Sequence, residues 1–256
     1  MFKRAIVRKP APNFADGLTT AGLGEPDYQL ALKQHQSYCK ALAERGLSVT
    51  VLDMDDRHPD STFVEDAAVL IGETAVLTRP GASSRAGEVA ALRPTLGSAV
   101  RHVLEISAPG TLDGGDVCDA EGHYLIGVSQ RTNEEGARQL AAIIEQAGFT
   151  ASLVDIRSRR DILHLKSGIA YLGDKDLVAW EELAELEQLR GYNLFRVGVG
   201  ERYAANCVRV NDKVLVAEGF PAFRQRLEDA GYDPLVLDVS EFRKMDGGLS
   251  CLSIRF

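Results

Sequence analysis

The chain has 256 residues, of which 45% are hydrophobic and 26% charged, as in ordinary globular proteins. Its formal net charge of -8 argues against a nucleic-acid partner and suits small cationic ligands. No apolar run reaches the length of a membrane span, and the apolar part of the first residues is too short for a signal peptide. The four cysteines show neither CxxC pairing nor zinc-finger spacing. We therefore expect one domain over residues 1–256, in the reducing cytoplasm, with free thiols.

In chain order, the first predicted elements are a strand over 2–9, a helix over 27–46 and a strand over 47–54. Four units follow, each with a β-hairpin, a helix and a further strand. Polar turns centred near residues 73, 122, 174 and 212 indicate the hairpins. The helices are expected over 83–96, 132–148, 180–192 and 221–232. The closing strands are expected over 100–106, 151–156, 193–199 and 234–239.

The second of these helices carries the clearest terminal signals. Thr132 and Glu135 form a capping-box pattern at its start, and Gly148 lies where a glycine commonly ends a helix.

The C-terminal residues 249–256 read "LSCLSIRF", an apolar stretch that supplies the first strand missing from the N-terminal unit. The pattern predicts an α+β fold, a five-fold pseudosymmetric propeller of ββαβ units around a central channel. Closing repeats into a ring protects strand edges, and here the two termini would pair within one unit. An α+β sandwich with the same elements is the alternative.

Polar residues recur at one position, just before each hairpin. Each has an ordinary structural interpretation, because a cysteine in an apolar run is most often a core residue and "DGG" favours a turn. Their repetition in successive units favours a nucleophilic cysteine site built from distant segments. These residues are Asp60, Glu65, Asp66, Asp113, Asp116, His164, Asn206 and Cys251.

The charges around this thiol indicate what it acts on. Carboxylates suppress thiol ionisation unless a cation is brought to the site, and a guanidinium pairs best with carboxylates. Arg79, Arg85 and Arg131 follow hairpins and are candidates to bind an anionic group, although Arg79, before Pro80, is more typical of a structural residue. The expected ligand is arginine or an arginine derivative.

Over essentially its whole length the chain resembles the dimethylarginine dimethylaminohydrolase family of the pentein, or guanidine-modifying, superfamily. The resemblance rests on segments such as "DGLTTAGLGEPDYQLALKQH", "PDSTFVEDAAV", "TRPGASSRAGE", "LDGGDV", "RTNEEGARQL", "LHLKSGIAYL", "YAANC" and "DGGLSCLSIRF". It implies that Cys251 is the nucleophile, His164 the general acid and base, and Asp113, which is Glu in some members, the supporting acid. It further implies substrate contacts in three groups. These are Glu65 and Asp66 for the guanidinium, Asp60 and the Leu18 carbonyl for the α-amino group, and Arg85 and Arg131 for the carboxylate.

The resemblance implies hydrolysis of asymmetric dimethylarginine and monomethylarginine to citrulline, through a covalent thiouronium on the cysteine and without metal or organic cofactor. It also suggests that the segment around Leu18 is a mobile lid. A homodimer is possible, and no nucleic-acid or membrane partner is expected. The alternatives are a deiminase-type hydrolase of free arginine or another guanidine, and a non-catalytic binding module of the same fold. Agmatine is disfavoured, because it lacks a carboxylate for Arg85 and Arg131 to bind.

Overall fold

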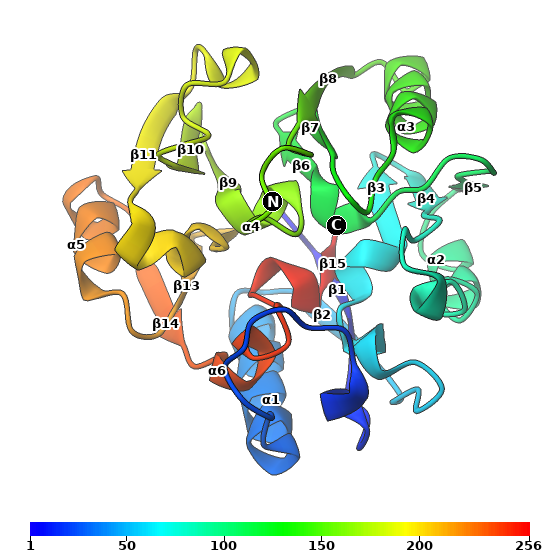
Figure 1. The fold of residues 1–256 in the computed structure, drawn as a ribbon, viewed down its shortest axis with the longest axis horizontal. Coiled ribbons are helices and arrows are strands. Elements are labelled where there is room, and N and C mark those ends of the chain that lie inside the picture. The colour runs from blue at the N-terminus through cyan, green and yellow to red at the C-terminus, as the bar shows by residue number, and fades with distance from the viewer.

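The computed structural model describes residues 1–256, with the strands in five three-stranded sheets set around a common centre (Figure 1). In every sheet the first strand pairs antiparallel with the second, and the second pairs parallel with the third. This is the ring of ββαβ units predicted from the sequence.

The unit that contains both termini closes the ring as expected. Its strands are β15 (Ile254–Arg255), β1 (Arg4–Arg8) and β2 (Ser48–Leu52). Ala5 lies opposite Arg255 in the antiparallel pair, and the backbone N–H groups of Lys3 and Arg4 both donate to the carbonyl of Phe256. The two ends of the chain therefore share one sheet.

The other four sheets follow in chain order, and their hairpin turns fall where the sequence predicts them. In the second hairpin, Glu121 and Gly122 both have positive φ, the conformation that the tightest hairpin turns require. The strands are β3 (Ala68–Ile71), β4 (Thr74–Leu77), β5 (His102–Glu105), β6 (Val117–Ala120), β7 (His123–Val128), β8 (Thr150–Asp155), β9 (Ile169–Gly173), β10 (Asp176–Trp180), β11 (Asn193–Val197), β12 (Val208–Val210), β13 (Lys213–Ala217) and β14 (Pro234–Leu237).

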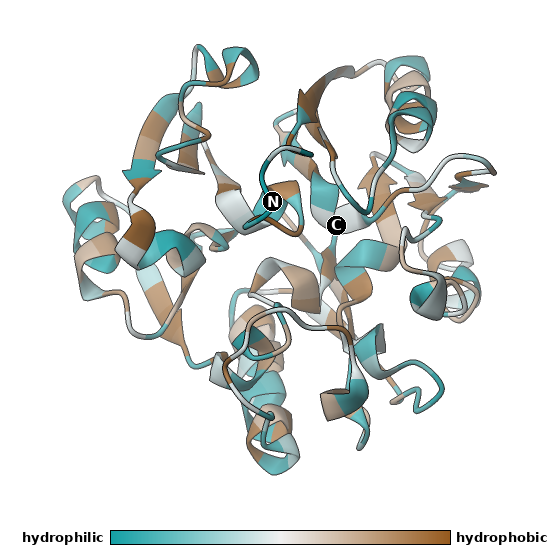
Figure 2. Ribbon diagram, viewed as in Figure 1, coloured by the Kyte–Doolittle hydropathy of each residue, from teal (hydrophilic) through white to brown (hydrophobic).

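The longer helices lie at the periphery of the ring, and their apolar faces pack inward against the largely apolar strands (Figures 1 and 2). They are α1 (Tyr28–Glu44), α2 (Arg93–Gly97), α3 (Glu134–Gln146) and α5 (Pro221–Asp229), and two short helices, α4 (Leu165–Gly168) and α6 (Ser240–Arg243), complete the set. No helix combines the length and the apolar character needed to cross a membrane.

Three local expectations were wrong. Residues 180–192 form successive turns and not an α-helix. The N–H groups of Leu183, Leu186 and Leu189 each bond to the carbonyl three residues back. The expected helix over 83–96 is interrupted: Ser83–Arg85 form a 3-10 turn, and only its end is α-helical, as α2. Helix α3 is capped by Asn133, since the Thr132 hydroxyl instead donates to Asp116.

A short turn or helix precedes the first strand of every sheet, and these five segments meet at the centre of the ring. They are the 3-10 turns Val64–Ala67, Gly114–Asp116, Val199–Ala205 and Ser250–Leu252, and helix α4. The polar residues singled out in the sequence lie on or beside these segments, so the repeat brings them together.

Candidate active site

Cys251 lies on the 3-10 turn just before β15 and is only 9% exposed. Burial raises the pKa of its thiol to about 12, and the nearby carboxylates of Glu65 and Asp66 add to that rise. The thiol is therefore neutral at physiological pH when no cation is bound.

His164 stands at the start of α4 and is buried beside two carboxylates. Its Nε2 lies 3.0 Å from Oδ2 of Asp113, and its Nδ1 lies 3.8 Å from Oδ1 of Asp66. Burial alone would lower the pKa of His164, but the Asp66 charge and the Asp113 hydrogen bond outweigh it and raise the pKa to about 9. The imidazole is thus a cation at neutral pH and can donate a proton.

Asp113 is fully buried, and its position is fixed from both sides of its carboxylate. Oδ1 accepts a hydrogen bond of 2.9 Å from the Gly81 backbone, while Oδ2 faces His164. The glycine two residues later makes this approach possible, since a Cβ on Gly115 would lie 2.8 Å from the His164 ring. The "DGG" motif therefore supplies both the acid and the space for the imidazole.

Asp66 joins the histidine to an arginine. Its Oδ2 accepts from Nη1 of Arg85 at 2.5 Å, and its Oδ1 accepts from the Gly115 backbone at 2.9 Å. Burial alone would raise the pKa of Asp66, but the charges of His164 and Arg85 lower it to about 2. Asp66 is therefore an anion directed toward the catalytic candidates.

Asp60 and Leu18 are in direct contact, as the resemblance implies for neighbouring parts of one subsite. Both oxygens of the buried Asp60 carboxylate accept from the Leu18 backbone N–H, at 3.1 and 3.2 Å. Burial raises the pKa of Asp60. A ligand ammonium at this place would meet a carboxylate in a poorly hydrated setting.

The two candidate arginines differ in how many of their donors are already used. Arg85 donates to Glu88 and Asp66 and to two backbone carbonyls, so most of its guanidinium is bonded within the protein. Arg131 has a buried Nη1 with no partner. Arg131 therefore has the greater spare capacity for an anion.

Most of these residues line one small cavity of about 20 Å³, which is room for about one water molecule. An amino-acid ligand therefore requires part of the wall to move. The lining residues are Leu18, Asp60, Phe63, Asp66, Arg85, Arg131, Leu163, His164, Met245, Asp246, Gly247 and Cys251. Sequence reasoning did not single out Phe63, Leu163, Met245 or Asp246. The only signal for them was adjacency to motif residues.

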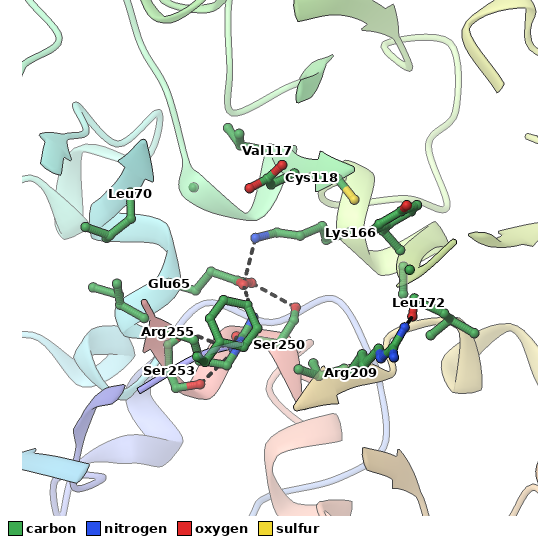
Figure 3. A pocket seen from close by; sticks show the side chains of 18 of the residues that line it. Glu65, Leu70, Val117, Cys118, Lys166, Leu172, Arg209, Ser250, Ser253 and Arg255 are labelled. Carbon is green, nitrogen blue, oxygen red and sulfur yellow. Dashed lines mark hydrogen bonds and ion pairs between the residues drawn. The ribbon is translucent and has the colours of Figure 1, made fainter. Parts of the chain in front are cut away.

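Glu65 lies differently from its neighbour Asp66. It borders a second cavity of about 490 Å³, lined by the first strands of all five sheets. Its Oε1 lies 2.7 Å from Nζ of Lys166, and its Oε2 accepts from the Ser250 hydroxyl at 2.8 Å (Figure 3). Two pairs of adjacent residues are thus divided between the two cavities. Glu65 and Ser250 line the larger cavity, and Asp66 and Cys251 line the smaller one.

Asp66, Asp113 and His164 also present ligand atoms within 4.8 Å of one another, as a metal site would. Each is already bonded, however, because Asp66 pairs with Arg85 and Asp113 holds the imidazole. The Arg85 cation beside Asp66 opposes a second cation there. The geometry suits a histidine held by acids.

Comparison with known proteins gives a consistent result over the full length. The model of the eukaryotic N,N dimethylarginine dimethylhydrolase family matches residues 24–189. The N(G),N(G)-dimethylarginine dimethylaminohydrolase of Pseudomonas aeruginosa is 43% identical and covers 100% of both chains. The enzyme of the same name from Streptomyces coelicolor is 37% identical, covering 99% of this chain and 96% of its own.

Solved structures agree with these matches. A cysteine-to-serine mutant of the Pseudomonas aeruginosa enzyme complexed with citrulline superposes with a TM-score of 0.97, at 42% identity and full coverage of both chains. A dimethylarginine dimethylaminohydrolase with a histidine replaced by glycine, as an adduct with S-methyl-L-thiocitrulline, gives a TM-score of 0.96 at the same identity and coverage. The N-terminal domain of ArgZ, an arginine dihydrolase, is 18% identical with a TM-score of 0.88 and shares the fold.

Proposed function

Because this chain belongs to the dimethylarginine dimethylaminohydrolase family, we propose that it hydrolyses N-omega-methylated arginines to citrulline and dimethylamine or methylamine. The observation that carries the proposal is the cavity that brings Cys251, His164 and Asp66 together with Arg131. A thiol, an acid–base group, an anion and a free cation are what a covalent reaction on an arginine requires. The citrulline complex of the similar Pseudomonas aeruginosa enzyme agrees with this product.

The substrate is bound through its two charged ends. Asp66 holds the guanidinium near the thiol, and the Arg131 Nη1 donates to the α-carboxylate, with Arg85 beside it. Asp60 and the Leu18 carbonyl bind the α-amino group. Glu65 also remains a candidate for the guanidinium, although its carboxylate is bonded to Lys166 and Ser250 in this structure.

The substrate's own charge activates the nucleophile. The pKa of Cys251 is about 12 in the free protein, so almost no thiolate exists at neutral pH. A bound guanidinium cation lowers this pKa, because it offsets the carboxylates that oppose ionisation. The thiolate therefore forms mainly when the correct substrate is present.

The reaction then proceeds in two steps. The Cys251 sulfur forms a bond to the guanidinium carbon, the bond to the methylated nitrogen breaks, and His164 gives its proton to the departing amine. A cationic S-alkylthiouronium remains. Neutral His164 next takes a proton from water, and the resulting hydroxide attacks the same carbon. The carbon–sulfur bond then breaks, and the proton of the added hydroxyl group passes to the sulfur, which releases citrulline and the neutral thiol. No metal or organic cofactor takes part.

Three further expectations are part of the proposal. All four cysteines are free thiols, which supports a reducing, cytoplasmic location. The chain can act as a homodimer, and residues 1–256 act as one domain.

The test is citrulline formation from asymmetric dimethylarginine, monomethylarginine, arginine and agmatine, with Cys251→Ser alongside. We expect turnover of the two methylated substrates and its loss in the variant. Turnover of arginine alone would move the substrate to the deiminase class. Folded protein that turns over none of the four would instead favour the non-catalytic binding module.

A further inference from the structure

Asn206 is buried at the end of the 3-10 turn Val199–Ala205, in the unit that contributes no other candidate to the site. From the sequence alone its role was open, and packing was the simplest interpretation. Its position before β12 matches that of the candidate residues before the other first strands. What it contacts decides its role.

The Asn206 amide uses both its donor and its acceptor ends on the two segments that carry the chemistry. Its Nδ2 donates to the Lys166 carbonyl at 3.0 Å and to the Ser250 hydroxyl at 3.1 Å. Its Oδ1 accepts from the Ser250 backbone N–H at 2.9 Å. Lys166 lies two residues after His164, and Ser250 directly precedes Cys251. Only an amide of this size can donate twice and accept once between these groups.

The chain is shaped to admit this side chain. A Cβ on Gly248 would lie 2.5 Å from Cγ and Oδ1 of Asn206. The second glycine of "DGGLSC" is therefore needed so that the backbone before Cys251 can pack against the amide. The absence of a side chain at Gly248 is therefore required for this packing as well as for the turn.

These bonds close into a ring that spans four of the five units. Ser250 donates to Glu65, Glu65 pairs with Lys166, and the Lys166 carbonyl accepts from Asn206, which returns to Ser250. Figure 3 shows the Lys166, Glu65 and Ser250 part of this ring on the wall of the larger cavity. Asn206, Ser250 and Lys166 do not line the small cavity that contains Cys251, so they support the site from outside it.

We propose that Asn206 is a positioning residue that fixes the segment carrying Cys251 at a set distance from the segment carrying His164. The inference rests on the proposed function, in which the sulfur attacks a carbon whose leaving group receives the histidine proton. Such a reaction needs the reacting atoms about 3–3.5 Å apart, and a displacement of about 1 Å can cost about 100-fold in rate.

The test compares Asn206→Asp with Asn211→Asp. Asn211 is a matched control, because its amide also donates twice, to the Phe2 and Arg45 carbonyls, and accepts once, from the Phe2 N–H. Each variant loses two donors and gains a charge, but only one lies behind the site. We expect kcat for dimethylarginine to fall roughly 10- to 100-fold in Asn206→Asp, with KM within about threefold of the wild type. Asn211→Asp keeps the wild-type kcat.

A second readout separates this proposal from the proposed function. The rate at which a cationic haloacetamidine alkylates Cys251 requires no turnover, and we expect it to fall in Asn206→Asp and not in Asn211→Asp. If Asn206→Asp does not fold, Ser250→Ala opens the same ring and carries the same expectations. An unchanged kcat or alkylation rate, with a lowered melting temperature like that of the control, would overturn the proposal and leave Asn206 a packing residue.

Discussion

At the residue scale, the charge on the Cys251 thiol depends on its anionic neighbours. Burial and the carboxylates of Glu65 and Asp66 raise the pKa of the thiol to about 12. An electrophile that brings a positive charge offsets these anions, whereas a neutral electrophile does not. The reactivity of this cysteine therefore depends on the charge of the reagent.

We expect a haloacetamidine to alkylate Cys251 at pH 7 at least tenfold faster than the neutral iodoacetamide, because a factor of ten needs only about one unit of pKa. Peptide mass spectrometry measures both rates, with the partly buried Cys39 as the internal control. In Asp66→Asn the removal of one anion lowers the pKa of Cys251, so the neutral reagent reacts faster. Equal rates for the two reagents in the wild type would contradict this assignment.

His164 makes the stability of the fold depend on pH. Its pKa rises from 6.5 to about 9 on folding, so it stabilises the folded state fully below pH 6.5 and loses that contribution as pH rises through 9. The difference corresponds to about 3 kcal/mol. In His164→Gln we expect the free energy of unfolding, measured with urea at pH 6.5 and 9, to fall less between the two values than in the wild type.

His35→Gln is the matched control, since His35 is equally buried but burial lowers its pKa to about 4. It stays neutral in the folded protein in both conditions, so its replacement removes only the effect of half-protonation of the unfolded chain at pH 6.5, about 0.4 kcal/mol. A wild-type stability that stays level or rises between pH 6.5 and 9 would contradict the Asp66 and Asp113 contacts as the cause.

At the element scale, the segment over residues 17–25 borders the small cavity through Leu18 and is hydrogen-bonded to residues near the C-terminus. The Thr20 N–H and hydroxyl both donate to the Asp246 carboxylate, and the Thr19 hydroxyl donates to the Lys244 carbonyl. Leu18 and Leu23 are exposed on this segment. A cavity of about 20 Å³ cannot admit an amino acid, so we expect this segment to act as a lid whose hydrogen bonds break and re-form in each catalytic cycle.

We expect Asp246→Ala to raise KM for dimethylarginine severalfold and to increase proteolytic cleavage within residues 17–25, because the closed state loses two hydrogen bonds. Bound citrulline restores protection in the wild type more than in the variant. Asp229→Ala, at an exposed helix position, serves as the control. Cleavage at one rate with and without ligand in the wild type would rule out a lid.

The elements show which parts of this molecule a sequence can predict. Hairpin turns have strong local chemistry, so all four were placed correctly. Helix ends depend on which partner a side chain chooses, and Thr132 bonds to Asp116 across the fold instead of capping α3. The turns over 180–192 satisfy the same apolar spacing as a helix, so pattern alone did not separate the two.

The site follows the same division. The repeat and the family motifs in the sequence predict a central position for Cys251, His164, Asp113, Asp66 and Arg131. They do not predict the direction in which each side chain points. Glu65 and Asp66 are adjacent in sequence yet border different cavities. Lys166 and Ser250 bind the Glu65 carboxylate, whereas Arg85 binds the Asp66 carboxylate. The orientation of these side chains depends on contacts between units that are distant in the sequence.

At the scale of the whole molecule, the ring closes through hydrogen bonds and not through the chain. The Phe256 N–H donates to the Arg4 carbonyl, and its own carbonyl accepts from Lys3 and Arg4 at 2.9 and 2.7 Å. The Arg4 guanidinium stacks over the Phe256 ring. The sheet that contains both termini is therefore complete without a covalent link between them.

We therefore expect a circular permutant to fold and retain most of its activity. In it a short Gly/Ser linker joins Phe256 to Met1, and new termini are opened at the exposed turn near Gly231, between α5 and β14. A short flexible closure changes stability by only about 1 kcal/mol, because loop entropy varies slowly with length. Urea unfolding and citrulline formation measure the two effects, with the unpermuted chain carrying the same linker at its C-terminus as the control.

We expect deletion of residues 254–256 to abolish folding and activity, since it removes β15 and the Arg255 bonds to the carbonyls of Ser250 and Ser253. A permutant that fails to fold while the deleted chain stays active would show that the ring is not closed by this pairing.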